Sequence, residues 1–208
     1  WHAMFGRGLV EPVDDLSDTN PATHSRLLER LAKDFEENAY DIRRTLRLIA
    51  ASETYRRSGT PIDGNQSDDR FHARAYGRPL DPEILADAVA DVTGVFDVYG
   101  NEPPGTRAIQ LFDPSTPAPS LDILGRCPPA ASCESSTSGG GLSAKLHQMN
   151  GDFLNRKIAD RDGRLHRLIA AGKSDVDIIV ELHLRALGRK PSRDQLEAWK
   201  TKLEAAAP

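Results

Sequence analysis

Apolar residues recur at helical spacing through most of this chain, and this pattern limits the folds that it can adopt. Leu28, Leu31 and Phe35 mark one face of a helix, and similar stripes recur towards the end of the sequence. The alternation of apolar and polar residues that is typical of strands is weak, and its only candidate is the short segment 107–112, RAIQLF. We therefore predict an all-α fold with about seven or eight helices.

Residues that favour helix ends support several of these helices. Asp81 suits an N-cap and Pro82 the first helical position, while Gly94 suits a left-handed C-cap. Ser192 and Gln195 form a capping-box pattern before the last helix. The predicted helices cover residues 25–39, 41–50, 82–93, 142–158 with a bend near Gly151, 165–171, 174–187 and 193–203.

Two irregular segments precede the third of these helices. Residues 1–22 lack periodicity and are predicted to form an ordered, extended arm, anchored by apolar residues. Residues 56–80 form a polar connection in which Phe71 and Tyr76 are candidate anchors. The anchoring residues expected in the arm are Trp1, Phe5, Leu9, Val10 and Val13.

The stretch from Pro103 to Asn150 separates the helical patterns on its two sides. It holds both cysteines, the triple glycine 139–141 and half of the 14 prolines. Such a composition indicates either a loop that displays a function or a connection between helical parts. We expect residues 1–208 to be a single helical domain fragment, with sub-halves 1–102 and 142–208 joined by an irregular Pro/Gly/Ser-rich connection, 103–141.

Composition excludes some classes of function. The net charge is −4 and no basic block exceeds two residues, which argues against nucleic-acid binding. No apolar run approaches the roughly 18 residues that suggest a membrane span. The sequence lacks the G-x-S-x-G, H-E-x-x-H and P-loop patterns. Whether the protein is an enzyme is therefore undecided, with a non-catalytic role favoured, and we expect no cofactor. The chain also starts without a signal peptide, and it looks cut from a longer protein.

Cys127 and Cys133 are the only cysteines, and five residues separate them. This spacing fits neither a C-x-x-C redox motif nor a haem attachment motif, and further zinc ligands at suitable spacing are missing. In an oxidising compartment the pair could close a small disulfide loop that stabilises the fold by about 2–3 kcal/mol. Two unrelated thiols are the alternative interpretation.

Polar residues of the irregular segments provide the candidate ligand-binding site. His147 and Asn150 would share a helix face, where they could bind a ligand or act as an oriented base, although a packed histidine is the commoner case. Acidic residues in the arm could hold calcium, but their spacing is not that of an EF-hand and such residues more often cap turns. We expect no metal site. The candidate residues are Asp14, Asp15, Arg107, Arg126, His147 and Asn150.

Five sequence blocks, in this order, resemble one protein family. They are FGRGLVEPVDDLSDTNPATH (5–24), LIAASETYRRSG (48–59), PEILADAVADVTGVF with PPGTRAIQLFDP (82–114), LGRC…SCESS…LHQMNGDF (124–153) and ELHLRALGRKPSRDQLEAW (181–199). The family is the planctomycete-specific C-terminal domain of unknown function, type one. The resemblance covers nearly the whole chain.

This resemblance implies an exported, multidomain bacterial protein and therefore an extracytoplasmic location, which favours the Cys127–Cys133 disulfide. The implied partners are other domains of the same polypeptide, among them a cytochrome-c-like module that carries its own haem. Two hypotheses follow. The first is a non-catalytic interaction or scaffold domain. The second is a carbohydrate-binding or hydrolytic domain, with polysaccharide as its ligand and its site between the N-terminal arm and the 103–150 stretch.

Overall fold

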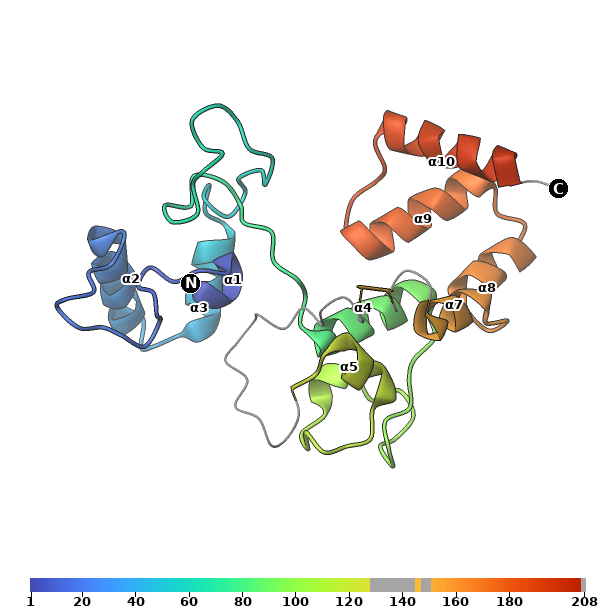
Figure 1. Ribbon diagram of the computed structural model, residues 1–208, viewed down its shortest axis with the longest axis horizontal. Coiled ribbons are helices and arrows are strands. Elements are labelled where there is room, and N and C mark those ends of the chain that lie inside the picture. The colour runs from blue at the N-terminus through green and yellow to red at the C-terminus, as the bar shows by residue number, and fades with distance from the viewer. Residues whose placement is uncertain (128–144, 147–150, 207–208) are drawn as a thin grey trace. The chain divides into compact units, whose positions relative to one another are not determined.

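The computed structural model describes residues 1–127, 145–146 and 151–206, and the regular elements in these ranges are helices without any strand. The all-α prediction is confirmed for this part of the chain. Two compact units are present, Trp1–Arg78 (unit 1) and Pro79–Pro208 (unit 2). Each is described by itself below, and both are drawn in Figure 1.

Unit 1 contains three helices. They are α1 (His2–Phe5), α2 (Ser25–Glu37) and α3 (Ile42–Ala50). The expected extended arm therefore begins with a short helix instead, which ends at Gly6 in the left-handed conformation. The Asp41 carboxylate accepts the Arg44 N–H and caps α3, as its position in the sequence predicts. α2 packs against α3, and Arg44 and Asp34 join the two helices in an ion pair of 2.8 Å.

The polar connection of unit 1 is held by His72, which sequence reasoning missed. His72 is buried, with a left-handed φ of 57°, and its backbone N–H donates to the Tyr76 hydroxyl. Tyr76 is half-buried, so its expected role as an anchor is confirmed. Phe71 is 56% exposed and does not have that role.

Unit 2 is built around α4 (Pro82–Thr93). This helix packs on the 3-10 helix η1 (Ala108–Gln110) and on four α-helices (Figure 1). Those four helices are α5 (Pro119–Leu124), α7 (Asp152–Ala159), α8 (Arg164–Ala170) and α9 (Asp175–Leu187). The last helix, α10 (Arg193–Ala206), packs on α9. The buried apolar cluster consists of Ala86, Tyr99, Ala108, Ala118, Leu121 and Leu124.

The boundary between the units differs from the expected halves 1–102 and 142–208. It falls between Arg78 and Pro79, because α4 and the segment from Tyr99 to Leu124 share one core with each other. Residues 103–127 are thus part of unit 2, and much of the remainder of the expected connection lies outside the described residues.

Helix ends agree with the local sequence signals. Pro82 occupies the first turn of α4, and Gly94 ends that helix with a φ of 73°. Ser174 caps α9 by accepting the Asp177 N–H. Ser192 and Gln195 form the predicted reciprocal capping box before α10. Of the helix predicted over 142–158, Lys145 and Leu146 are described and helical, and α7 starts after Gly151.

The strand candidate 107–112 is wrong, because its centre forms the 3-10 helix η1. The Asp87 carboxylate of α4 accepts the backbone N–H groups of Ala108 and Ile109 at 2.7 and 3.1 Å. These donors are therefore satisfied by a side chain, and a neighbouring strand is not needed to pair them. Within the described ranges, every helix is too short or too polar to cross a lipid bilayer.

Candidate functional site

The predicted site residues are divided between the two units and the residues outside the described ranges. Asp14 and Asp15 belong to unit 1, whereas Arg107 and Arg126 belong to unit 2. His147, Asn150 and Cys133 lie outside the described residues.

Arg107 is held in a network with α4. Its guanidinium group donates two hydrogen bonds to Asp91, at 3.0 and 2.7 Å, and its Nε lies 3.4 Å from Asp87. The hydrogen bonds from Arg107 lower the pKa of Asp91, and the same bonds raise the pKa of Arg107. The side chain fastens η1 to α4, and its hydrogen-bonding groups are already engaged there.

Arg126 has a comparable structural role at the end of α5. Its side chain is 10% exposed, donates to Asp122 at 2.8 Å and donates to the Thr116 carbonyl at 2.9 Å. It therefore ties the loop before α5 to the residues after that helix. Arg126 is nearly closed off by these contacts, whereas the side chain of Arg107 remains 38% exposed.

Asp14 and Asp15 are exposed in the arm between Leu9 and Asn20. Asp15 accepts the backbone N–H of Ser17, a turn-capping contact. Among the described residues, no three His, Cys, Asp or Glu side chains are grouped so that they could hold a metal ion. The contacts of the arm are those of a turn.

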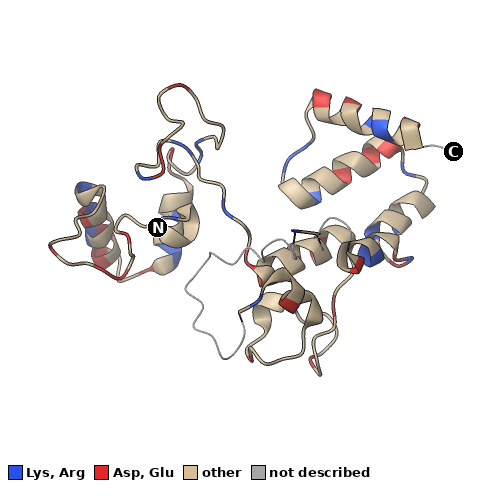
Figure 2. Cartoon of the chain, viewed as in Figure 1, with Lys and Arg blue, Asp and Glu red and all other residues tan. Residues whose placement is uncertain are grey.

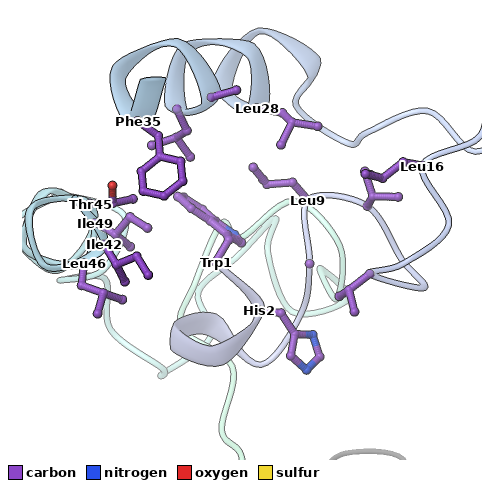
Figure 3. Close-up of a pocket in the computed structure, with 15 residues that line it drawn as sticks. Trp1, His2, Leu9, Leu16, Leu28, Phe35, Ile42, Thr45, Leu46 and Ile49 are labelled. Carbon is purple, nitrogen blue, oxygen red and sulfur yellow. The ribbon is translucent and has the colours of Figure 1, made fainter. Parts of the chain in front are cut away.

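An open apolar groove is the main hollow of unit 1. We call it the unit 1 groove; its volume is about 490 Å³. Figure 3 shows α2 with Leu28 and Phe35 along one side, α3 with Ile42, Thr45, Leu46 and Ile49 along a second, and Leu9 and Leu16 of the arm along a third. The remaining lining residues are Trp1, His2, Gly8, Val10, Val13, Leu31 and Ala32.

The groove is apolar because the arm only partly covers the apolar faces of α2 and α3. α2 is strongly amphipathic, and its apolar residues Leu28, Leu31 and Phe35 are only partly buried. Ile42 and Leu16 are 65% and 72% exposed at two of the walls. An amphipathic helix normally buries its apolar face, so α2 presents a surface that a further contact would complete.

The arm forms its wall of the groove through a tight turn. Gly8 donates its N–H to the Glu11 carboxylate at 2.8 Å, and a Cβ at Gly8 would lie 2.1 Å from the Val10 carbonyl oxygen. Only glycine fits this turn without a shift of the backbone. Thr23 fixes the other end of the arm, because its N–H and hydroxyl both donate to the Leu9 carbonyl.

Trp1 is positioned in the groove by His72. Its indole N–H donates to His72 Nε2 at 3.2 Å, and its ring stacks on Phe5 with centroids 4.2 Å apart. An accepting Nε2 requires a neutral His72 with its proton on Nδ1. Burial lowers the pKa of His72, and the positive charges of His24, Arg7 and Arg57 lower it further, against an opposing contribution from Asp68.

Asp68 organises the loop that carries His72. Its carboxylate accepts the backbone N–H groups of Phe71 and Ala73 at 2.8 and 2.6 Å, and the Tyr76 hydroxyl at 3.1 Å. These bonds, that from Phe71 first, hold the pKa of Asp68 well below its usual range. Burial raises the pKa of Tyr76, so Tyr76 stays a donor to Asp68.

Unit 2 has a smaller apolar pocket of about 380 Å³ between its helices. Leu154, Leu182, Leu187 and Trp199 contribute to its lining, together with His183, whose Nδ1 lies 3.1 Å from the Ile179 carbonyl oxygen. Lys157 lines it as well, but the Lys157 ammonium group is paired with Asp97 at 3.0 Å and with the Val95 carbonyl at 2.8 Å. This buried lysine has a structural partner on each side.

The candidate sites of both units thus consist of apolar surface and of side chains engaged in structural contacts. The chain belongs to the PSD1 family, described as a protein of unknown function (DUF1553), whose family model matches residues 1–203. This match confirms the family resemblance of the sequence blocks. Comparisons with curated proteins and with solved structures give no match.

Proposed function

We propose that this chain is a non-catalytic interaction domain of an exported, multidomain protein, and that it contacts another domain of the same polypeptide through the unit 1 groove. The single observation that carries the proposal is the apolar groove beside the amphipathic helix α2, whose apolar residues are only partly buried and whose other walls expose Leu16 and Ile42. Covering one large apolar side chain stabilises a contact by about 1.5–3 kcal/mol at full burial, and the groove offers several.

The occupied arginines support a non-catalytic role. A hydrolytic or carbohydrate site needs polar groups that converge on a ligand. Arg107 and Arg126, two of the residues proposed for such a site, instead hold η1 and α5 in place through ion pairs. The unit 1 groove offers mainly hydrocarbon, which suits burial against a protein surface better than chemistry.

The extracytoplasmic location and the Cys127–Cys133 disulfide are parts of the same proposal and rest on the family resemblance. The candidate partner domains include a cytochrome-c-like module. A thiol assay on exported protein, under denaturing and non-reducing conditions, tests the disulfide. We expect no free thiol, and two free thiols would overturn this part of the proposal.

The interaction itself is tested by expressing the domain and the remainder of its polypeptide as separate chains. We expect them to associate in isothermal titration calorimetry, and Ile42→Asn in the groove to weaken the association at least tenfold. Ile169→Asn is the matched control, because Ile169 is similarly exposed, at 59%, but lies in unit 2. Association that Ile42→Asn leaves unchanged would refute the groove as the contact surface.

A further inference from the structure

We infer that the unit 1 groove binds an amphipathic α-helix whose lysine or arginine side chains lie over the arm segment Glu11–Asp18. This inference rests on the proposed function and specifies the partner. Its evidence is the combination of an apolar lining with an acidic segment, Glu11–Asp18, that contributes Val13 and Leu16 to this lining.

The shape of the groove suits a helix. Leu28, Leu31 and Phe35 of α2 line one side of the groove over about two helical turns. This is a distance of about 10 Å, which is close to the diameter of a helix. α2 and α3 already pack as a pair, so a third helix would cover both of their apolar faces. Helix-in-groove binding uses apolar residues at spacings of three and four to fill such a surface.

The exposed walls argue against a small apolar ligand. Ligand pockets bury most of the ligand, which requires walls that close around it. Leu16 and Ile42 stand at opposite sides of the groove in Figure 3, and both are more than half exposed. A long apolar element that contacts both walls would bury these side chains, whereas a small molecule on the floor would leave them in water.

The charge of one wall specifies the partner further. Val13 and Leu16 line the groove, and the same segment carries Glu11, Asp14, Asp15 and Asp18 (Figure 2). The sequence has no lysine or arginine between Arg7 and Arg26. Asp14, Asp15 and Asp18 are exposed next to the lining and form no ion pair within the described residues, so a basic side chain at the edge of the groove beside Leu16 would meet uncompensated negative charge.

Exposed residues of the other sign flank the opposite side of the groove, outside its lining. Arg43 and Arg47 of α3 are exposed beside Ile42 and Leu46, and no carboxylate within the described residues pairs with them. Basic residues on the partner are therefore favoured only at the arm. The positive N-terminus of a helix dipole is favoured at the same place, which predicts a direction for the bound helix.

Synthetic peptides test the partner class directly. The first is a helical peptide of about 18 residues with leucines at helical spacing and lysines in its N-terminal half; the second is identical except that glutamates replace the lysines. Trp1 lines the groove, so its fluorescence in a Trp199→Phe background reports binding. We expect the lysine peptide to bind at least tenfold more tightly, and the difference to shrink as salt is raised.

Variants locate the effect. The triple variant Asp14→Asn, Asp15→Asn and Asp18→Asn is expected to lower the affinity for the lysine peptide by about two- to fivefold per carboxylate removed, without a change in helicity. Asp69→Asn is the control, because Asp69 is an exposed acidic residue of unit 1 outside the segment Glu11–Asp18 that contributes to the groove. Equal affinity for the two peptides, or an equal loss from the control, would overturn the inference.

The two proposals fail separately. If the remainder of the polypeptide binds in an Ile42-dependent manner but neither peptide binds, the groove is an interaction surface and the basic-helix inference is wrong. If the lysine peptide binds with the expected charge dependence but the remainder of the polypeptide does not, the partner class stands and the proposed partner within the same polypeptide is wrong.

Discussion

Asp87 is expected to be far more important for the stability of unit 2 than its neighbour Asp91, although both contact Arg107. Asp87 is 7% exposed, and its carboxylate accepts the N–H groups of Ala108 and Ile109. Asp91 binds Arg107 through two hydrogen bonds, but its side chain is 47% exposed. The substitutions Asp87→Asn and Asp91→Asn therefore form a matched pair.

The magnitudes follow from what each substitution leaves unpaired. In Asp87→Asn, one oxygen still accepts an N–H, but the new amide group directs its own hydrogens at a backbone donor or at Arg107. A buried donor without an acceptor costs about 1–3 kcal/mol, and loss of the charge on the acceptor adds to this, for a total of about 2–4 kcal/mol. Asp91→Asn breaks an exposed ion pair, which costs about 1 kcal/mol or less.

Urea unfolding distinguishes these outcomes. In a Trp1→Phe background, Trp199 fluorescence reports the unfolding of unit 2. With a slope of about 2 kcal/mol per molar urea, we expect Asp87→Asn to lower the midpoint by about 1–2 M and Asp91→Asn by less than about 0.5 M. Equal shifts would refute the reasoning, because they would mean that the buried backbone donors of η1 do not depend on the Asp87 carboxylate.

Three further perturbations have defined outcomes. The pKa of His72 is lowered in the fold, so its contribution to stability is present above about pH 6.5 and is lost as the pH falls. Asparagine tolerates the left-handed backbone of this position, so His72→Asn should keep the loop conformation. The substitution should flatten the fall in thermal midpoint between about pH 7 and 5, and it should shift the fluorescence emission of Trp1. An unchanged pH profile would contradict this. The lowered pKa of Asp68 gives stability that is present above about pH 4 and lost on acidification, so Asp68→Asn should lower the free energy of unfolding by about 1–3 kcal/mol at neutral pH and progressively less in acid titrations followed by circular dichroism. Lys157→Met leaves Asp97 unpaired and should cost about 3–5 kcal/mol in urea unfolding, and a loss below about 1 kcal/mol would show that the pair is unimportant.

Local sequence signals were sufficient for many helix ends because a cap is a contact within a few residues. Pro82 and Gly94 bound α4, and Ser192 pairs with Gln195 three positions later, so each signal is complete in the sequence. The periodicity of apolar residues likewise predicted the helical class. The direction in which an amphipathic face points also follows from periodicity, but whether anything covers that face does not.

Contacts between distant residues explain what the sequence did not predict. His72 is buried because Trp1, 71 positions earlier, donates to its ring, and no pattern around His72 indicates that contact. Segment 107–112 has the sequence pattern of a strand, but Asp87, about 20 positions earlier, accepts its N–H groups and stabilises a 3-10 helix instead. Arg107 appeared available for a ligand for the same reason. The contact of Arg126 with Asp122, by contrast, was open to prediction from local sequence, because the two residues are four positions apart in one turn of chain.

Hydrogen–deuterium exchange on the complete polypeptide tests the central claim most directly. The amide exchange of α2, α3 and the segment 9–16 is compared between the isolated domain and the same residues within the full-length protein. If another domain occupies the unit 1 groove, these amides exchange more slowly in the full-length protein, and Ile42→Asn restores the faster rates. Identical exchange of these segments in both proteins would contradict the account.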